Sequence, residues 1–397
     1  MANTLVSIET ITGTTGTGQT ATFNFSNGTA LNKMFHFCSF QGNVADSLHD
    51  QFYKSSALTA TDTLTITAGQ TSANLSISFI CYVVIFSTDS DLVVQRFTTP
   101  TPNVDTANNQ AITAVSATSQ AFIIPHGETD PTDTTIGSEE LWEYRLTSTT
   151  NAAIFCDGGN NSAHPGVKFE VVDWGNGDIR VQHLNGNAMT TLESTDTATI
   201  PSAIVNGKAW LITTGTTVAG GTSMPPADLV FRADFQDTST VRVRKGRATL
   251  AMNWSAQVIE DISTGGIWDV DIGNIAMTTA QTSNTLSIGT VNTSRTFVWG
   301  TSLNTISPGG QSPDTTTNNI DNAIATVTLT DSTTITAVRG VTDTQTFDTF
   351  VQAVEFLQLV SPSASASASV SPSASASRSL SPSASLSPSA NGGAWRE

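Results

Sequence analysis

The chain has 397 residues, only 12% of them charged, and a net charge of −17 at pH 7. An acidic chain lacks the basic surface that nucleic acid and anionic membranes attract, so the composition argues against both as partners. The remaining polarity comes mainly from Thr, Ser and Asn, which favour strands and turns. No long stretch has the apolar period of a helix, and we therefore expect an all-β protein.

The beginning of the chain leads directly into a strand pattern. Residues 1–4 carry neither the basic nor the apolar segment of a secretory signal. The most apolar run, residues 79–86, is too short to cross a bilayer. We expect a soluble protein, synthesised in a host cytoplasm, without an encoded export route or membrane insertion.

Aromatic residues that open a strand recur at a nearly constant spacing. Phe35, Phe122, Trp210 and Phe297 follow one another at intervals of 87, 88 and 87 residues. A Thr-rich middle segment and an apolar closing strand follow each of them in the same order. Three landmarks in one order at one spacing indicate tandem repeats of a small β unit.

The first two units are expected at residues 1–86 and 87–174. In the first, alternating polar and apolar residues predict strands at 5–8, 21–25, around the aromatic residue, within 58–65 and at 82–86. In the second, strands are predicted at 92–95, 111–115, around the aromatic residue, at 141–146 and at 170–174.

The third and fourth units are expected at residues 175–261 and 262–360. The third has predicted strands at 179–182, 198–200, around its aromatic residue, and at 229–235, 241–244 and 257–260. The fourth has them at 268–271, 285–288, 296–299, within 327–336 and at 351–356. Hairpin-like junctions leave no flexible linker, so the four β-sandwich-like repeats are expected in a fixed relation, as a rod or a compact stack.

Residues 361–397 form a low-complexity tail in which every odd position from Ser361 to Ser389 is serine. Its composition is that of a disordered or linker-like segment. A strict period of two would also place serines on one face of an extended chain and Ala, Val and Leu on the other. Two readings remain, a solvated thread or a tail docked on a partner through Val370, Leu380, Leu386 and Trp395.

The cysteines and histidines show no motif. An odd count of three cysteines, Cys38, Cys81 and Cys156, is no disulfide framework. Buried reduced thiols are the favoured interpretation, with a Cys38–Cys81 bridge as the alternative. The five histidines form no HxH, HExxH or Cys–His zinc spacing, so they are interpreted as ordinary polar residues. Residues 269–274 resemble a calcium loop only faintly, and no metal site is predicted.

Catalytic motifs are also missing from the sequence. There is no GxSxG, P-loop or dinucleotide-binding glycine pattern, so we predict no catalytic residue, no cofactor and no enzyme activity. The one basic cluster in this acidic chain is Arg242, Arg244, Lys245 and Arg247. It is either a solvated strand end or a contact for an anionic glycan or an acidic subunit.

The order of landmarks in the fourth unit resembles repeats of structural proteins from tailed bacteriophages. The matching residues are Phe297, the segment 329–334, Arg339 and the ending 352–356. The first unit departs most, with Ile85 where the closing strand is otherwise acidic. The resemblance implies a virion fibre or decoration protein that assembles with other virion subunits, forms homo-oligomers and contacts host surface glycan.

Two other classes remain open. A bacterial surface adhesin or extracellular filament subunit with a Ser/Pro-rich stalk is weakened because no signal and no wall anchor are visible. A tailspike polysaccharide depolymerase would need converging carboxylates. The nearest candidates, Glu139 with Glu140 and Asp130 with Asp133, lie in one variable loop of one unit.

Overall fold

Antiparallel strands make up most of the computed structural model, which confirms the all-β prediction. Residues 1–359 form one compact unit. In the parts that the structure describes, no helix is long and apolar enough to cross a membrane. The described residues are 3–15, 20–42, 54–68, 77–99, 107–128, 141–155, 166–218, 225–300, 303–304, 307–308, 324–340 and 346–357.

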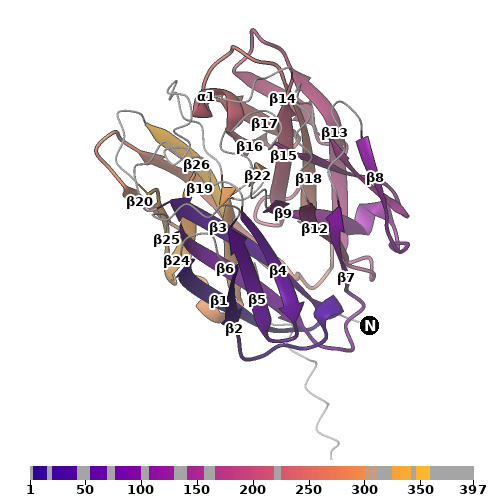
Figure 1. Ribbon diagram of the computed structural model, residues 1–397. Coiled ribbons are helices and arrows are strands. Elements are labelled where there is room, and N and C mark those ends of the chain that lie inside the picture. The colour runs from indigo at the N-terminus through magenta and orange to yellow at the C-terminus, as the bar shows by residue number, and fades with distance from the viewer. Residues whose placement is uncertain are drawn as a thin grey trace, which may run out of the picture. The chain divides into compact units, whose positions relative to one another are not determined.

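Strands in the first half of the chain lie close to the predicted positions (Figure 1). Residues 1–86 form β1 (Leu5–Thr15), β2 (Thr20–Asn24), β3 (Met34–Gly42), β4 (Lys54–Ala60), β5 (Thr63–Ala68) and β6 (Ile77–Phe86). Residues 87–174 form β7 (Val93–Thr99), β8 (Ala107–Ala111), β9 (Ala121–Glu128), β10 (Glu143–Ser148), β11 (Asn151–Phe155) and β12 (Val167–Asp173). The strand predicted at 111–115 lies earlier in the chain, because β8 ends at Ala111, where the predicted strand begins.

Strands in the second half also lie close to their predicted positions, with one correction. Residues 175–261 form β13 (Ile179–Met189), β14 (Thr195–Thr199), β15 (Ala209–Thr217), β16 (Phe231–Asp237), β17 (Thr240–Lys245) and β18 (Met252–Asp261). The start of the strand predicted at 229–235 is wrong, because a helical turn, α1 (Pro226–Leu229), precedes β16. Residues 262–360 form β19 (Trp268–Met277), β20 (Ser283–Ser287), β21 (Thr296–Gly300), β22 (Leu303–Asn304), β23 (Ser307–Pro308), β24 (Thr326–Asp331), β25 (Thr334–Val338) and β26 (Phe347–Phe356).

One strand order occurs four times. The last strand of each stretch lies between the first and the third, in the orders β1-β6-β3, β7-β12-β9, β13-β18-β15 and β19-β26-β21. A second set of three strands accompanies each, in the orders β2-β5-β4, β8-β11-β10, β14-β17-β16 and β20-β25-β24. A contact between Ser55 and Gly127 joins the sets β2-β5-β4 and β7-β12-β9 into one six-stranded sheet.

Successive residues of the third strands face different cores, because side chains alternate across a strand. Phe122 and Ile124 of β9 belong to a large core shared by all four stretches. Ile123, between them, packs in a separate core with β10, β11 and β12. β15 is buried along its whole length for the same reason. The fold thus combines sandwich-like local cores with one common core.

The four aromatic residues that mark the sequence period meet in the common core. Ring centroids are 6.1 Å apart for Phe35 and Phe122, 5.4 Å for Phe122 and Trp210, and 5.6 Å for Trp210 and Phe297. All four side chains are almost fully buried. Large aromatic side chains supply much apolar area per residue, so this cluster stabilises the contacts between stretches.

Side chains from closing strands bond the free edges of third strands. Gln257 of β18 accepts from the backbone N–H of Ile123 at 2.7 Å and donates to its carbonyl at 2.9 Å. Gln352 of β26 makes the same pair of bonds to Leu211 of β15, at 2.7 and 2.8 Å. Buried backbone groups need partners, and the amide side chain has one acceptor and one donor side to satisfy both.

Late strands bond the first sheet directly. The backbone N–H of Val327 in β24 donates to Ser39 Oγ of β3 at 3.2 Å. The N–H of Leu329 donates to the hydroxyl of Tyr82 in β6 at 2.9 Å. An equivalent bond runs from the N–H of Tyr144 in β10 to Thr214 Oγ1 in β15. The beginning and the end of the described chain are therefore held together by buried hydrogen bonds.

Cys38 and Cys81 form a disulfide that joins directly paired positions of β3 and β6. The favoured interpretation of these two residues as reduced thiols is therefore wrong, and the bridge left as the alternative is present. Cys156 lies outside the described residues.

Candidate functional site

Three closing strands bond the third strand of the preceding stretch, and we call these contacts junctions. At the first junction a buried carboxylate lies where the other two have glutamine. Glu170 of β12 is paired with Ile124 of β9, as Gln257 is paired with Ile212 and Gln352 with Trp299. Its Oε2 accepts from the backbone N–H of His36 in β3 at 3.2 Å. Glu170 thus bonds the edge of β3 as the glutamines bond β9 and β15, but a carboxylate cannot donate to a carbonyl.

Arg96 of β7 bonds the same strand at positions other than His36. Its two terminal nitrogens donate to the carbonyls of Leu31 and Met34, just before and at the start of β3. Its Nε lies 2.8 Å from Glu170 Oε1, as a charge partner rather than an aligned hydrogen bond. Burial by itself would raise the pKa of Glu170, but Arg96 and two histidines hold it well below its usual value.

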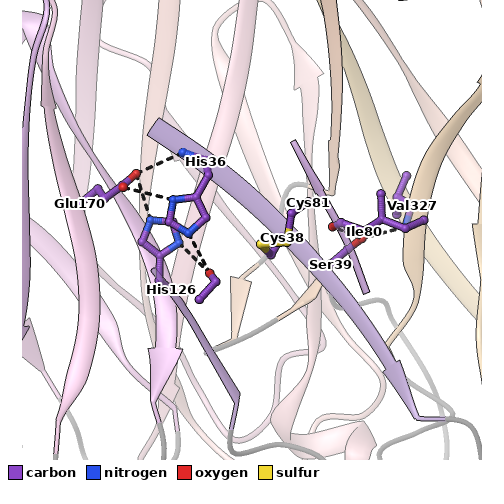
Figure 2. The surroundings of a disulfide bond; sticks show 9 residues. His36, Cys38, Ser39, Ile80, Cys81, His126, Glu170 and Val327 are labelled. Carbon is purple, nitrogen blue, oxygen red and sulfur yellow. Dashed lines mark hydrogen bonds and ion pairs between the residues drawn. A yellow bond between two sulfur atoms is a disulfide. The ribbon is translucent and has the colours of Figure 1, made fainter. Parts of the chain in front are cut away.

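Two histidines complete the cluster around this carboxylate, as Figure 2 shows. His36 Nδ1 and His126 Nε2, the latter from β9, each lie 3.1 Å from one Glu170 oxygen. The two rings are stacked 3.7 Å apart and nearly parallel. Burial, followed by the neighbouring His36, lowers the pKa of His126 to about 4, so this ring is neutral near pH 7.

Ser56 of β4 lies at the far side of both rings. Its Oγ is 3.0 Å from His36 Nε2 and 3.3 Å from His126 Nδ1. Glu170, His36, Ser56 and His126 thus form a ring of four side-chain contacts. Lys168 lies nearby and donates to Ser55 Oγ at 2.8 Å.

A cavity of about 140 Å³ adjoins the cluster. Its polar lining consists of all four members of the ring together with Arg96, Thr98 and Lys168. A space of this size holds a few water molecules or one small anion, and its basic lining favours negative charge.

The order Ser56–His36–Glu170 resembles that of a hydrolase triad, in which a serine, a histidine and a carboxylate are bonded in series. Ser56 is only 1% exposed, however, and its hydroxyl is shared with His126. A nucleophile enclosed in this way does not reach a substrate carbonyl. The chemistry that the geometry favours is the binding of charge, through two imidazoles and a carboxylate within 4.8 Å of one another.

Sequence motifs did not reveal this cluster, because its members are far apart in the chain. The period offers a signal nonetheless. His36 follows its aromatic landmark by one residue, where the next two stretches have Ile123 and Leu211. His126 follows its landmark by four residues, where the neighbouring stretches have Ser39 and Thr214. Departures from a repeated pattern at one junction could have marked these positions.

The predicted basic cluster lies on and after β17, and most of its charges have partners inside the chain. Arg242 is paired with Asp234 and Arg247 with Asp228. Lys245 is buried and donates to the carbonyl of Leu250. Burial, with nearby Arg232 and Arg242, lowers the pKa of Arg244. Whether this strand end contacts a glycan or another subunit stays a prediction.

The tail positions Val370, Leu380, Leu386 and Trp395 lie outside the described residues, as do His49 and His164. No protein-family model, no curated protein and no solved structure matches the chain.

Proposed function

We propose that the chain is a non-enzymatic structural protein of a viral particle surface, built from four tandem β units that hold one another in a fixed arrangement. The observation that carries the proposal is the recurrence of one strand order together with one type of edge contact. Three closing strands bond the third strand of the preceding stretch through the side chain at one register position. Such contacts hold successive units rigidly against one another.

Rigid scaffolds with variable loops suit fibres and decoration proteins, which display binding surfaces on a particle. The resemblance of residues 297–356 to phage structural repeats supports this class. The disulfide between Cys38 and Cys81 fits a protein that works in an oxidising environment outside a cell. Assembly with other virion subunits and with further copies of the chain is part of the proposal.

The test is to find the protein in purified particles. An antibody raised against the recombinant chain should label particles from a culture that carries the gene, and light scattering of the purified chain should give a homo-oligomer. Particles without the protein, together with a monomer at micromolar concentration, would contradict the proposal. Cell-surface labelling in the absence of particles would favour an adhesin, which the disulfide permits equally well.

Hydrolytic activity distinguishes the third class. A polysaccharide depolymerase should shorten capsular glycan when purified protein is added, whereas a fibre or decoration protein binds glycan without cutting it. Size-exclusion chromatography of the glycan before and after incubation separates these outcomes.

A further inference from the structure

The first junction breaks the pattern of the other two at several adjacent positions. Gln257 and Gln352 are neutral and satisfy one backbone N–H and one carbonyl each. Glu170 replaces them with a buried charge, and His36 and His126 add two imidazoles. A buried ionic cluster does not stabilise the folded state more than the amide that the molecule uses at its other junctions. Positions at which one repeat departs from the pattern of the others are expected at functional sites.

Four side-chain contacts close a ring, since Ser56 Oγ faces one nitrogen of each imidazole and Glu170 faces the other nitrogen of each. His126 Nε2 is the ring atom without an aligned hydrogen bond, although it lies 3.1 Å from Glu170 Oε2.

A cation beside the carboxylate and the rings gives His126 Nε2 a partner. With both imidazole protons on the nitrogens that face Ser56, whose oxygen has two lone pairs to accept them, His36 Nδ1 and His126 Nε2 are ligand atoms on the side of Glu170. Because the rings are nearly parallel, their lone pairs run side by side, and the rings must tilt toward each other for both nitrogens to reach one ion. Separations of 3.1 Å between each ring nitrogen and a carboxylate oxygen match those between ligands of one ion with bonds of about 2.0–2.2 Å.

We propose that His36, His126 and Glu170 bind a divalent transition-metal ion of the Zn²⁺ type. Two imidazoles and one carboxylate form a ligand set that zinc accepts, with a further position open. Ser56 fixes the ring tautomers, and Arg96 lies beside Oε1 of Glu170, the oxygen that also faces His36, as outer partners of metal ligands commonly do. The stacked rings tilt toward each other when the ion enters.

The adjoining cavity provides the remaining position. It is lined by the three ligands and also by Arg96 and Lys168. With a divalent ion in place, these two side chains make the site strongly positive, so the fourth ligand is a small anion rather than neutral water. This site is independent of the proposed role on a particle, because each can fail without the other.

The experiment uses the full chain without an affinity tag, freed of metal by a chelator and then titrated with Co²⁺. Binding is read from the visible absorption of four-coordinate Co²⁺ and from the metal content after dialysis, and azide serves as the anionic probe. Glu170→Gln and His126→Ser are the informative variants, since they introduce the residue types that the chain uses at equivalent positions elsewhere. His183→Gln alters a half-buried histidine outside the site and is the matched control.

The wild type and His183→Gln should bind a single ion per chain with a four-coordinate spectrum that azide changes. Glu170→Gln and His126→Ser should lose it, and Ser56→Ala should weaken binding about 10- to 100-fold. A wild-type chain that takes up no more Co²⁺ than Glu170→Gln overturns the proposal, whether or not the variants fold well. A spectrum unaffected by azide overturns the anionic fourth ligand.

Discussion

The contact of β12 with β3 differs in its side chains from the contacts of β18 with β9 and of β26 with β15. At all three, a side chain of a closing strand bonds the free edge of a third strand. Gln257 and Gln352 bond both the N–H and the carbonyl of one residue, whereas Glu170 bonds only an N–H and is surrounded by Arg96 and two histidines. The comparison teaches that an amide is sufficient for cohesion, so the charged version serves some further purpose.

Replacement of Glu170 by leucine should have the largest effect. It leaves Arg96 beside an apolar group and removes the acceptor for the His36 N–H. Loss of one partner of a buried ion pair typically costs about 3–5 kcal/mol of folding free energy. Urea unfolding of Glu170→Leu measures this loss, with Glu170→Gln as the variant that restores the pattern of the other junctions. A loss below about 1 kcal/mol in the leucine variant would show that Arg96 needs no charge partner there.

The disulfide distinguishes the first stretch from the others in another way. β3 is tied covalently to β6 by Cys38 and Cys81, which are 43 residues apart in sequence. Replacing both with alanine should lower the free energy of unfolding by about 2–4 kcal/mol, because the unfolded chain is no longer constrained. Denaturant unfolding of the variant tests it, and the wild type with reductant is the control. Equal stability of variant and wild type would contradict the expectation.

The neutral junctions can be broken at one residue. Gln257→Leu leaves the buried N–H and carbonyl of Ile123 without the partners they have in the wild type. Two such groups should cost about 2–4 kcal/mol together, since each unsatisfied buried group costs about 1–3 kcal/mol. Gln257→Glu is a second variant of interest, because His183, and not an arginine, is paired with Gln257 at the register position where Arg96 is paired with Glu170. If Gln257→Leu unfolds at the wild-type denaturant concentration, the edge contact is not structural.

The smallest effect concerns pH at the second junction. His183 of β13 is bonded to the carbonyls of Thr118 and Ala121, which precede and begin β9. Burial lowers its pKa, although both carbonyl contacts act in the opposite direction. The unfolded chain therefore takes up a proton first, and stability present above about pH 6.5 is lost as the pH falls below it.

Unfolding free energies of wild type and His183→Gln between pH 7 and 5 test this sign. The wild type should lose stability more steeply on acidification than the variant, which retains an amide donor. The depressed pKa of His126 acts in the same pH range, so only the difference between the two slopes reports on His183. Parallel slopes would show that His183 contributes nothing.

The sequence by itself determined the class of fold. Alternation of polar and apolar residues located most strands, and the spacing of Phe35, Phe122, Trp210 and Phe297 identified the residues that meet in the common core. Both signals are local or periodic, because side chains alternate along a strand and large aromatic side chains are most often buried.

Tertiary structure alone decided which edges meet. Glu170 lies 134 residues from His36 in the chain, and Gln257 lies equally far from Ile123, so no short motif contains either pair. Taken singly, His36 and His126 match ordinary polar residues, although they stack on each other in the fold. A charge in a sequence does not say whether it ends in water or against another strand, and that distinction depends on how whole sheets pack. The chemistry of this protein lies in that packing.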